Sequence, residues 1–457
     1  MPFLPVLLIT DALLWLLVGA ALVYAAYCAG RPHLAAPWRR VFQSKAALVC
    51  AVILLAYLAV GLADSLHFRL RLEQVEGASG AAYSPEVLSV LDLALERLRT
   101  RQEKTYSAPL ASRLYAREQI ELAGGKVERG FPRLRYGGAH LKDEGGRWQD
   151  IGGSILLGVF AAAVLGGLFS MGAKGLERRN PRVPWRAAAG TLFALALVAL
   201  PVAFLARDYH VLGTDKVGQD VLFQALKSIR VSLVIGTVTT LVLLPLGAAL
   251  GIMAGYFKGW VDDAIQYLYT TLNSIPGVLL IAAFVLMLQV VIERNAELFP
   301  TAAHRADVRL VALCAILGLT SWTGLARLLR GEALKLSQLE YIQAAHAFGV
   351  SSARVLSRHI LPNVAHIVII TLVMDFSGLV LAEAVLSYVG VGVDPATISF
   401  GTMINAARLE MGRDPIVWWS LAAAFFFMFA LVLAANLFAD AVRDGFDPRV
   451  RMGTVPV

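Results

Sequence analysis

The sequence predicts an all-α polytopic membrane protein, and three observations lead to this fold class. Of the 457 residues, 58% are hydrophobic and only 16% are charged, which is too little polar surface for a soluble chain of this length. Apolar runs of about 20 residues recur, and this is the length that a helix needs to cross a hydrocarbon core roughly 30 Å thick. The runs do not alternate apolar and polar residues as the strands of a transmembrane β-barrel do.

We place nine membrane spans along the chain, in two parts. An N-terminal extension, residues 1–186, carries three spans, and a core, residues 187–457, carries six. The spans are expected at 4–29, 46–66, 152–173, 187–206, 231–255, 263–291, 308–328, 364–390 and 416–438. No basic stretch precedes the first run, which is also longer than the apolar part of a signal peptide, so we interpret it as a transmembrane helix.

Basic residues in short segments indicate the orientation. Arginine and lysine recur in residues 30–45, 174–186 and 327–362 and in the C-terminal tail. Nine alternating spans place these four segments on one side, which the positive-inside rule identifies as the cytoplasm. The N-terminus is then expected on the periplasmic side and the C-terminus on the cytoplasmic side. The formal net charge of +8 follows from the same bias, so we expect no nucleic-acid partner.

The longest polar stretch, residues 67–151, is expected on the outer side as a small external domain. It mixes charges of both signs, and long loops are exempt from the charge rule. Ser84-Pro85 is typical of a helix start, and apolar residues follow it at helical spacing from Val87 to Leu98. A second helix is predicted after Ser107, ending at Gly124-Gly125. A loosely ordered loop is the alternative.

Motifs for metal or nucleotide binding are missing from the sequence. Cys28, Cys50 and Cys314 each lie in an apolar run and form no CxxC pair. The eight histidines show no HExxH spacing, and no GxxxxGK[ST] phosphate loop occurs. We therefore expect no metal and no cofactor in this chain.

One polar stretch between two spans, SQLEYIQAAHAFGVSSARVLSRHILPN at residues 337–363, has the pattern of two short helices. An apolar stripe recurs at helical spacing on the first helix, at Tyr341, Ala344, Ala345 and Phe348. Gly349 is expected to end this helix in a left-handed conformation, and Ser351 or Ser352 to cap the next one. Pro362 is expected to stop the second helix. Such an apolar ridge fits a groove on another protein or, alternatively, lies on the lipid surface.

The same stretch resembles the cytoplasmic "EAA" loop of ABC importer permeases. The resemblance rests on the spacing of Gln343-Ala344-Ala345, Gly349 and Ile360-Leu361-Pro362, with Gln343 where glutamate is usual. In that family the loop is a coupling helix that docks into a cleft of the ATPase subunit. The resemblance thus implies ATPase coupling by Glu340, Tyr341, Gln343, Ala344, Ala345, Phe348, Gly349, Arg354, Leu361 and Pro362.

Two further stretches resemble the dipeptide, oligopeptide and nickel permeases of this family. HVLGTDKVGQDVLFQALKSIRVSL, residues 210–233, is similar to the family's GTDxxGRD segment, with Gln219 in place of arginine. The matching residues are Gly213, Thr214, Asp215, Gly218 and Asp220. From the residues alone we expect a turn at Gly213 and an external helix from Val217. GLVLAEAVLSYVGVGV, residues 378–393, is similar to the fifth core helix.

The likeness covers roughly residues 187–450 and implies the six-helix core of a type I ABC importer permease. It implies ATP-driven import of peptides across the bacterial inner membrane, or of nickel or another small solute. It also implies a homologous second permease, one or two ATPases that bind ATP and Mg, and an external solute-binding protein. From the residues alone, an ion-coupled secondary transporter and a membrane sensor are the rivals, but no convincing repeat and no output domain is found.

Polar residues within the spans are candidates for the translocation path. A charge at the bilayer centre costs about 3 kcal/mol on insertion scales. Asp375 and Glu383 are eight positions apart, so they share roughly one helix face about 12 Å apart. Asn273 and Ser274 precede Pro276, which frees backbone groups for other partners. These four polar residues either line or gate the path, or they make structural contacts between helices.

Overall fold

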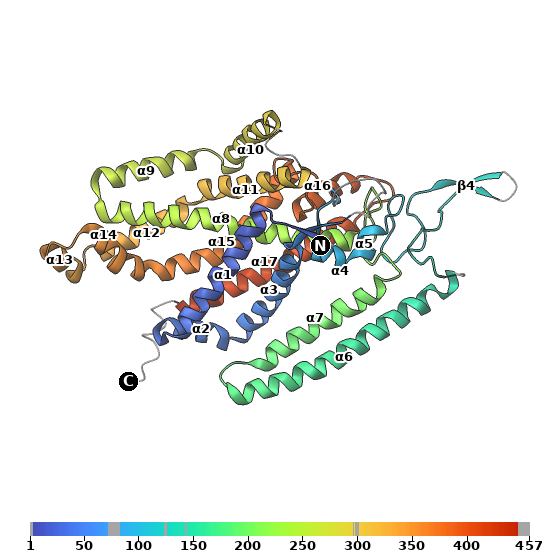
Figure 1. Cartoon of the computed structure of the whole chain (residues 1–457), viewed down its shortest axis with the longest axis horizontal. Coiled ribbons are helices and arrows are strands. Elements are labelled where there is room, and N and C mark those ends of the chain that lie inside the picture. Colours follow the sequence, from blue (N-terminus) through green and yellow to red (C-terminus); the bar gives the residue numbers. More distant parts are fainter. Residues whose placement is uncertain are drawn as a thin grey trace. The chain divides into compact units, whose positions relative to one another are not determined.

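The computed structural model describes residues 3–71, 83–122, 126–141, 144–295, 297 and 301–446 (Figure 1). Eight of the described helices are long and apolar enough to cross a membrane, and the bent pair α11 (Ala302–Ser321) and α12 (Thr323–Leu336) raises the number to nine. The eight helices are α1 (Ile9–Ala29), α3 (Lys45–Asp64), α6 (Arg147–Arg179), α7 (Trp185–Leu205), α8 (Val221–Phe257), α10 (Gly277–Arg294), α15 (Leu361–Val389) with the turns before it, and α17 (Trp419–Phe446). The predicted fold class is confirmed.

The chain forms two compact units. Residues 1–7, 42–232 and 398–434 make the first unit, and residues 8–41, 233–397 and 435–457 make the second. Helices α8 and α17 contribute residues to both units. The boundary drawn from the sequence at residue 186 stays a prediction.

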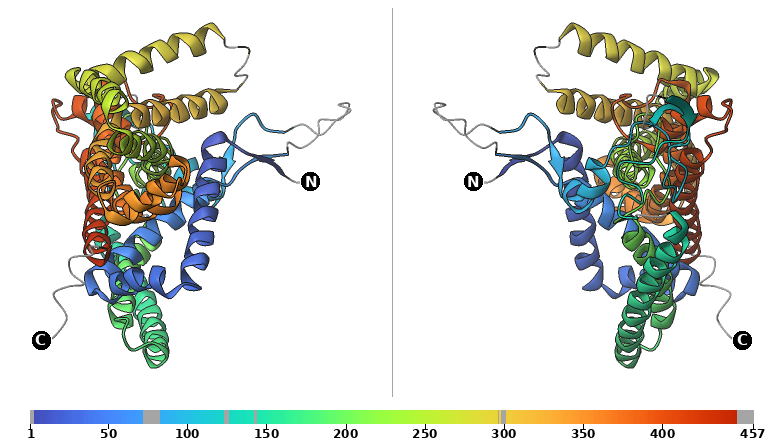
Figure 2. Two further views of the ribbon diagram at one scale, coloured as in Figure 1. Left: turned by 90° about the vertical axis from the view of Figure 1, so that its left-hand side faces the viewer. Right: turned by 90° about the vertical axis from the view of Figure 1, so that its right-hand side faces the viewer.

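The first unit contains both small sheets of the described chain. Strands β1 (Phe3–Val6), β2 (His67–Leu70) and β3 (Leu88–Ser89) pair antiparallel in that order, and Figure 2 shows β1 beside β2. Strands β4 (Glu118–Leu122) and β5 (Lys126–Gly130) form a separate antiparallel pair. Two short helices, α4 (Val90–Ala94) and α5 (Glu96–Thr100), follow β3.

Both helices predicted within residues 67–151 need correction. Ser84 does not start a helix, since its hydroxyl accepts a hydrogen bond from the backbone of Glu86 in a turn. The cap lies at Ser89, which exchanges hydrogen bonds with Asp92 in a capping box and starts α4 at Val90. In place of the second helix the chain forms the β4–β5 pair. The predicted helix end at Gly124-Gly125 lies outside the described residues.

Helices α6 and α7 lie side by side in the first unit (Figure 1) because small residues let their backbones approach. An added Cβ at Gly158 would lie 2.4 Å from Cα of Pro201, and one at Gly166 would lie 2.3 Å from the ring of Phe193. The outer face of α6 exposes large apolar side chains, among them Phe160 at 70%. Such a surface is suited to lipid or to a second membrane helix.

An ion-pair cluster joins α3, α4 and the start of α8 in the first unit. The ammonium group of Lys227 lies 2.8 Å from a carboxylate oxygen of Asp64 and 2.8 Å from one of Asp92. Ser89 also donates a hydrogen bond to Asp64. Because both carboxylates are buried, removing Lys227 would leave two buried charges unpaired. Helix α16 (Phe400–Glu410) completes this unit.

Close packing of α8 on α12 builds the core of the second unit. Gly247, Gly251 and Gly255 recur every fourth residue along α8 and face α12. An added Cβ at Gly251 would lie 2.5 Å from the carbonyl oxygen of Ala326, and one at Gly255 would lie 2.4 Å from that of Arg330. This small-residue stripe lets the two backbones touch.

The expected span 263–291 is two helices in the structure, α9 (Gly259–Ser274) and α10 (Gly277–Arg294). The break falls at Ile275-Pro276, because proline has no backbone N–H and its ring does not continue a helix. Of the two, only α10 qualifies as a membrane span. Helix α9 is held to α12 by a bidentate ion pair in which Arg330 donates to both carboxylate oxygens of Asp262, at 2.5 and 2.6 Å.

The first helices of the chain also pack within the second unit. The carboxylate of Asp307 in α11 accepts a hydrogen bond from the backbone N–H of Ile9 at 2.7 Å and so caps α1. Helix α2 (Pro32–Gln43) contacts the end of α17, where the rings of Trp38 and Phe446 meet edge to face at 5.2 Å. The unit is completed by α13 (Glu340–Ala347), α14 (Ser352–Val355) and a π-helical turn at Leu356–Ile360 that leads into α15.

Candidate functional site

Helix α13 presents an apolar edge to the surface while one side chain anchors it. Phe348 is 86% exposed and Tyr341 is 46% exposed, whereas Ile342 is fully buried in the core of the second unit. Ala344 is exposed, and Ala345 is turned partly inward against that core. The predicted ridge is therefore present at Tyr341, Ala344 and Phe348, with Ala345 at its inner border.

Gly349 ends α13 as predicted. Its φ of +73° is left-handed, and the backbone N–H groups of Gly349 and Val350 donate to the carbonyls of His346 and Ala345 at 2.9 and 3.0 Å. This is the Schellman arrangement that favours glycine at this position. Ser351 occupies the N-cap of α14, but its side chain makes no capping hydrogen bond. The predicted side-chain cap is therefore absent.

The prediction that Pro362 stops a second helix is wrong. Residues 352–389 form one continuous helical segment of 38 residues, and Pro362 lies in the first turn of α15. The π-helical turn at Leu356–Ile360 precedes it directly. A wider turn relieves the clash of the proline ring with the preceding carbonyls, which explains how the helix continues.

The remaining predicted coupling residues are also exposed. Exposed side chains occur at Glu340, Gln343, Arg354, Leu361 and Pro362. The amide of Gln343 donates to the carbonyl of Gln338 at 3.1 Å. Polar and apolar side chains are thus both exposed on this loop, beside the apolar ridge of α13.

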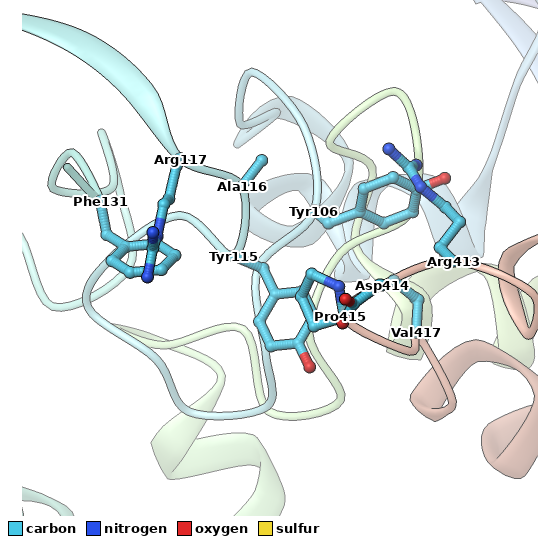
Figure 3. Close-up of a pocket in the computed structure, with 9 residues that line it drawn as sticks. All are labelled: Tyr106, Tyr115, Ala116, Arg117, Phe131, Arg413, Asp414, Pro415 and Val417. Carbon is cyan, nitrogen blue, oxygen red and sulfur yellow. The ribbon is translucent and has the colours of Figure 1, made fainter. Parts of the chain in front are cut away.

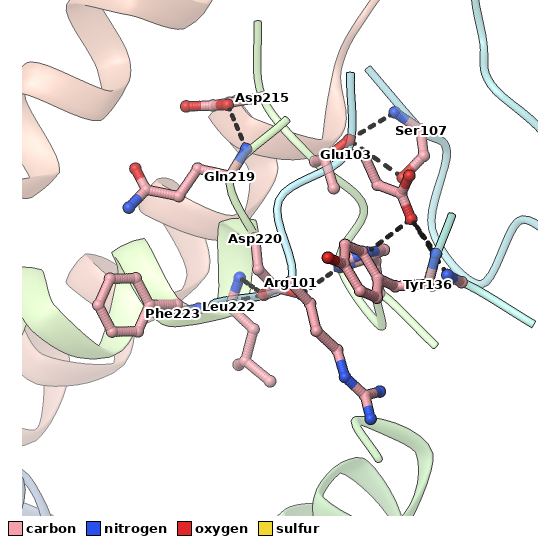
Figure 4. Close-up of polar contacts among 12 residues, drawn as sticks. Arg101, Glu103, Ser107, Tyr136, Asp215, Gln219, Asp220, Leu222 and Phe223 are labelled. Atoms are coloured by element: carbon pink, nitrogen blue, oxygen red, sulfur yellow. Dashed lines mark hydrogen bonds and ion pairs between the residues drawn. The ribbon is translucent and has the colours of Figure 1, made fainter. Parts of the chain in front are cut away.

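The turn before α8 gathers all five residues of the second motif. Gly213 and Gly218 both have left-handed φ values, of +73° and +76°. Asp215 accepts hydrogen bonds from the backbone N–H groups of Val217 and Gln219, and Figure 4 shows Asp215 beside Gln219. These contacts close the turn and leave no helix at Val217.

Helix α8 begins at Val221, four residues later than predicted, because Asp220 caps it. The Asp220 carboxylate accepts hydrogen bonds from the N–H groups of Leu222 and Phe223 at 2.8 and 3.2 Å (Figure 4). An acidic side chain at this point also complements the positive end of the helix dipole.

Residues 103–107 pack directly on this turn. The hydroxyl of Thr214 accepts from the N–H of Ser107 at 2.7 Å and donates to the carbonyl of Thr105 at 2.9 Å. An added Cβ at Gly218 would lie 1.8 Å from the carbonyl oxygen of Glu103. The motif glycines are therefore sites of close backbone approach.

A buried ionisable cluster links the same two segments. Nδ1 of His210 donates to the carboxylate of Asp220 at 2.7 Å, and Nε2 lies 3.4 Å from the carboxylate of Glu103. Burial opposes the charged ring, but the two carboxylates outweigh it and raise the pKa of His210 to about 9. Burial also opposes ionisation of Glu103, yet His210 and three backbone N–H groups at residues 135–137 lower its pKa to about 2.

Comparison with known proteins shows the family of this chain. The family model described as "Binding-protein-dependent transport system inner membrane component" matches residues 247–452, which include α13. The glutathione transport system permease protein GsiD of Pectobacterium atrosepticum is 32% identical over 310 residues, which cover 60% of this chain and 95% of that protein. This chain belongs to that family, the permeases of ABC importers.

Two further relatives support the assignment. The oligopeptide transport system permease protein OppC of Mycobacterium tuberculosis is 33% identical over 242 residues, covering 53% of this chain and 77% of that protein. The dipeptide transport system permease protein DppC of Bacillus subtilis is 28% identical over 245 residues, covering 53% and 69%. The permease is thus a transport subunit that crosses the bacterial inner membrane several times, and the resemblance drawn from its motifs is confirmed.

The two acids that the sequence placed on one face of α15 differ in burial and in their partners. Glu383 is fully buried and accepts a hydrogen bond from Ser387 at 2.7 Å. Asp375 is half-buried, and within the described residues its carboxylate has no hydrogen-bond or ion-pair partner. Glu383 therefore has the surroundings of a structural contact, whereas Asp375 reaches the surface of the permease.

The two polar residues before Pro276 are both exposed. The side-chain oxygen of Asn273 accepts a hydrogen bond from Thr323 at 3.2 Å, which joins α9 to α12. Ser274 donates to the carbonyl of Thr271 one turn earlier. Their assignment to the translocation path stays a prediction.

Sequence reasoning missed the contact that fixes α13 to α8. The Tyr256 hydroxyl lies 2.9 Å from Nε2 of His346, and the two rings are stacked with centroids 5.6 Å apart. The residues are 90 positions apart, so no local pattern pairs them. It also missed Glu103, which lies far from the motif in sequence and carries no pattern of its own.

Proposed function

We propose that this permease translocates peptides. The relatives described above are named for oligopeptide, dipeptide and glutathione transport, and glutathione is itself a tripeptide. The likeness spans nearly the whole of the glutathione permease. Peptides are therefore the substrate class that we favour over nickel or another small solute.

We further propose that transport is driven by separate subunits. One or two ATPases would bind ATP and Mg on the cytoplasmic side, a homologous second permease would complete the membrane part, and an external solute-binding protein would deliver the peptide. In this arrangement the chain itself carries no cofactor and catalyses no reaction. The N-terminus would lie on the periplasmic side and the C-terminus in the cytoplasm, as the basic segments indicate.

The observation that carries this proposal is which side chains of α13 are exposed and which are buried. Its exposed residues Tyr341 and Phe348 frame Ala344, a small side chain that permits close approach, while buried Ile342 fixes the helix to the core. A helix that is anchored on one side and apolar on the other suits a groove on a partner. Nucleotide-driven movement of the ATPases would then move α13 and bias the permease between two packings.

Ala344→Glu tests this coupling. A glutamate at this exposed position leaves the permease fold intact but places bulk and an unpaired charge at the centre of the contact, which costs several kcal/mol at a buried interface. We expect the ATPases to be lost on co-purification, or ATP hydrolysis to become insensitive to substrate. Gln343→Glu is the matched control, because it adds the same charge one residue earlier, where the family usually has glutamate.

Two outcomes of the test count against the proposal. If Ala344→Glu keeps full ATPase association and substrate-stimulated hydrolysis, α13 is not the coupling helix and the lipid-surface interpretation is favoured. If the wild-type complex assembles in proteoliposomes but accumulates no labelled peptide, the substrate class is wrong.

A further inference from the structure

A pocket of about 590 Å³ opens in the first unit, between the segment that leads into the β4–β5 pair and the loop after α16 (Figure 3). It is lined by Tyr106, Tyr115, Ala116, Arg117, Phe131, Arg413, Asp414, Pro415 and Val417. This volume is within the range of small-molecule sites, roughly 300–1,000 Å³. None of its lining residues belongs to the coupling loop, residues 337–363, or to the turn before α8.

One end of the pocket carries an available guanidinium group. Arg117 is exposed, and its guanidinium lies over the ring of Phe131 at 5.4 Å from the centroid. In the described chain it makes no hydrogen bond and no ion pair, and the adjacent carboxylate, Glu118, is paired with Lys104. A planar guanidinium held on a ring presents a fork of donors that matches a carboxylate.

The other end carries an available carboxylate. Asp414 is exposed and, among the residues that the structure describes, has no hydrogen-bond or ion-pair partner. The adjacent Arg413 does not neutralise it, because Arg413 is paired with Glu410 at 3.0 Å and lies over the ring of Tyr106. Figure 3 shows Arg117 and Asp414 on opposite sides of Tyr115.

The middle of the pocket is apolar and held in place. The ring of Tyr115 meets that of Trp419 edge to face at 4.9 Å, and its hydroxyl donates to the carbonyl of Ile416 at 3.2 Å. Tyr106 is 4% exposed and forms a second ring wall. Aromatic surfaces of this kind contribute contact area at low entropic cost.

We propose that this pocket binds a small zwitterion, with its carboxylate on Arg117, its ammonium group on Asp414 and an apolar body against the tyrosines. A short peptide with free termini has this chemistry, and naming it as the ligand rests on the proposed peptide transport. A phosphate or a dicarboxylate fits less well, because Asp414 repels a second negative charge. The site would hold substrate on the permease itself, outside the membrane-spanning helices.

Direct binding to the purified full-length permease in lipid nanodiscs tests the proposal. The probe is the tripeptide Ala-Phe-Ala, compared by calorimetry with its C-terminal amide, which lacks the carboxylate, and its N-acetyl form, which lacks the ammonium group. We expect the zwitterion to bind and each blocked form to bind about tenfold more weakly or less, equivalent to about 1.4 kcal/mol.

Two pocket variants assign the two ends. Arg117→Gln should weaken the zwitterion about tenfold, to the affinity of the amide. Asp414→Asn should make the zwitterion and the N-acetyl form bind equally. Arg129→Gln is the matched control, since Arg129 is an exposed arginine of β5 outside the pocket, and it should change nothing.

The proposal is overturned if Ala-Phe-Ala does not bind at millimolar concentration, if the blocked forms bind as well as the zwitterion, or if Arg129→Gln has the same effect as Arg117→Gln. Failure here is separable from failure of the proposed transport. If the complex imports peptides but the isolated permease does not bind the zwitterion, only the pocket proposal is refuted. Zwitterion binding that depends on Arg117, in a complex that imports no peptide, refutes only the transport function.

Discussion

The hydroxyl of Tyr256, at the end of α8, lies 2.9 Å from Nε2 of His346 on α13, and the two rings are stacked at an interplanar angle of 27°. Together with buried Ile342 this contact attaches α13 to the core of the second unit and to α8. A displacement of α13 would therefore be transmitted to α8 through a hydrogen bond and a ring contact.

We predict that His346→Ala uncouples the permease while leaving the ATPases bound, because the apolar ridge of α13 is unchanged. Tyr256→Phe removes only the hydrogen bond, worth about 0.5–1.5 kcal/mol, and should have the smaller effect. The measurement is the stimulation of ATP hydrolysis by substrate in the reconstituted complex. Stimulation should fall several-fold with His346→Ala.

Ser357→Ala is the control for this pair. Ser357 is exposed on the same segment, residues 337–363, and its hydroxyl donates to the carbonyl of Arg354 one turn earlier. Substrate stimulation should stay at the wild-type level. Equal stimulation in wild type and His346→Ala would show that movement of α13 reaches the membrane helices by another route.

Residues 337–363 show how far local patterns determine this site. Gly349 was predictable, because glycine supplies the left-handed backbone that ends α13 at no steric cost. The contact between Tyr256 and His346 was not, since it joins residues distant in sequence. Pro362 misled the prediction because a π-helical turn accommodates the ring and tertiary packing continues the helix.

The second prediction concerns pH. A raised pKa means that protonated His210 stabilises the fold fully below its unfolded value of 6.5, and that this contribution is lost as pH rises to about 9. The shift corresponds to about 3 kcal/mol. Glu103, with its pKa lowered to about 2, contributes fully above 4.5 and loses its contribution only as pH falls toward 2.

The melting temperature of the purified permease should therefore fall as pH rises from 6.5 to 9. His210→Gln should be less stable than wild type at pH 6 and should lose much of the pH dependence in that interval, since a neutral amide cannot pair with two carboxylates. An unchanged pH dependence in His210→Gln would assign the effect to another group.

The third prediction is that Gly218→Ala disrupts the packing of residues 103–107 on the turn. The added methyl group would lie 1.8 Å from the carbonyl oxygen of Glu103, so backbone must move. Gly259→Ala is a matched control, because Gly259 is also left-handed, at φ +54°, but faces open space. It should cost only the strain of the left-handed conformation, about 1–2 kcal/mol.

Stability and proteolysis distinguish the two glycine variants. Gly218→Ala should lower the melting temperature more than Gly259→Ala and should speed cleavage within residues 84–140. Similar losses in both variants would mean that backbone strain alone, and not the contact with Glu103, explains the requirement for glycine.

The same segment also shows where sequence reasoning went wrong. The run after Ser107 was interpreted as helical, whereas residues 118–122 and 126–130 pair as strands. A glycine pair between two short runs is a hairpin signal, and the helical interpretation overlooked it. The helix cap was placed at Ser84 because serine before proline fits a helix start, but Ser89 followed by Asp92 forms the capping box.

The fourth prediction concerns orientation. Arg129→Cys should react with an impermeant maleimide on cells stripped of their outer membrane, whereas Arg179→Cys should react only after the membrane is opened. The three native cysteines are buried and should give a low background. The reverse pattern would invert the proposed topology.

The last prediction separates the two acids of α15. Asp375 has no partner in the described part of the chain, so Asp375→Leu should leave the stability of the purified permease unchanged or raise it, because an unpaired charge in the membrane is costly. If its carboxylate faces the translocation path, the same variant should lower peptide uptake per assembled complex.

Glu383 is fully buried and accepts a hydrogen bond from Ser387. Glu383→Leu should therefore lower yield and stability first, by leaving the Ser387 hydroxyl without that partner. Normal uptake in Asp375→Leu would exclude this carboxylate from the path, and lower uptake with full stability in Glu383→Leu would assign the path role to Glu383 instead.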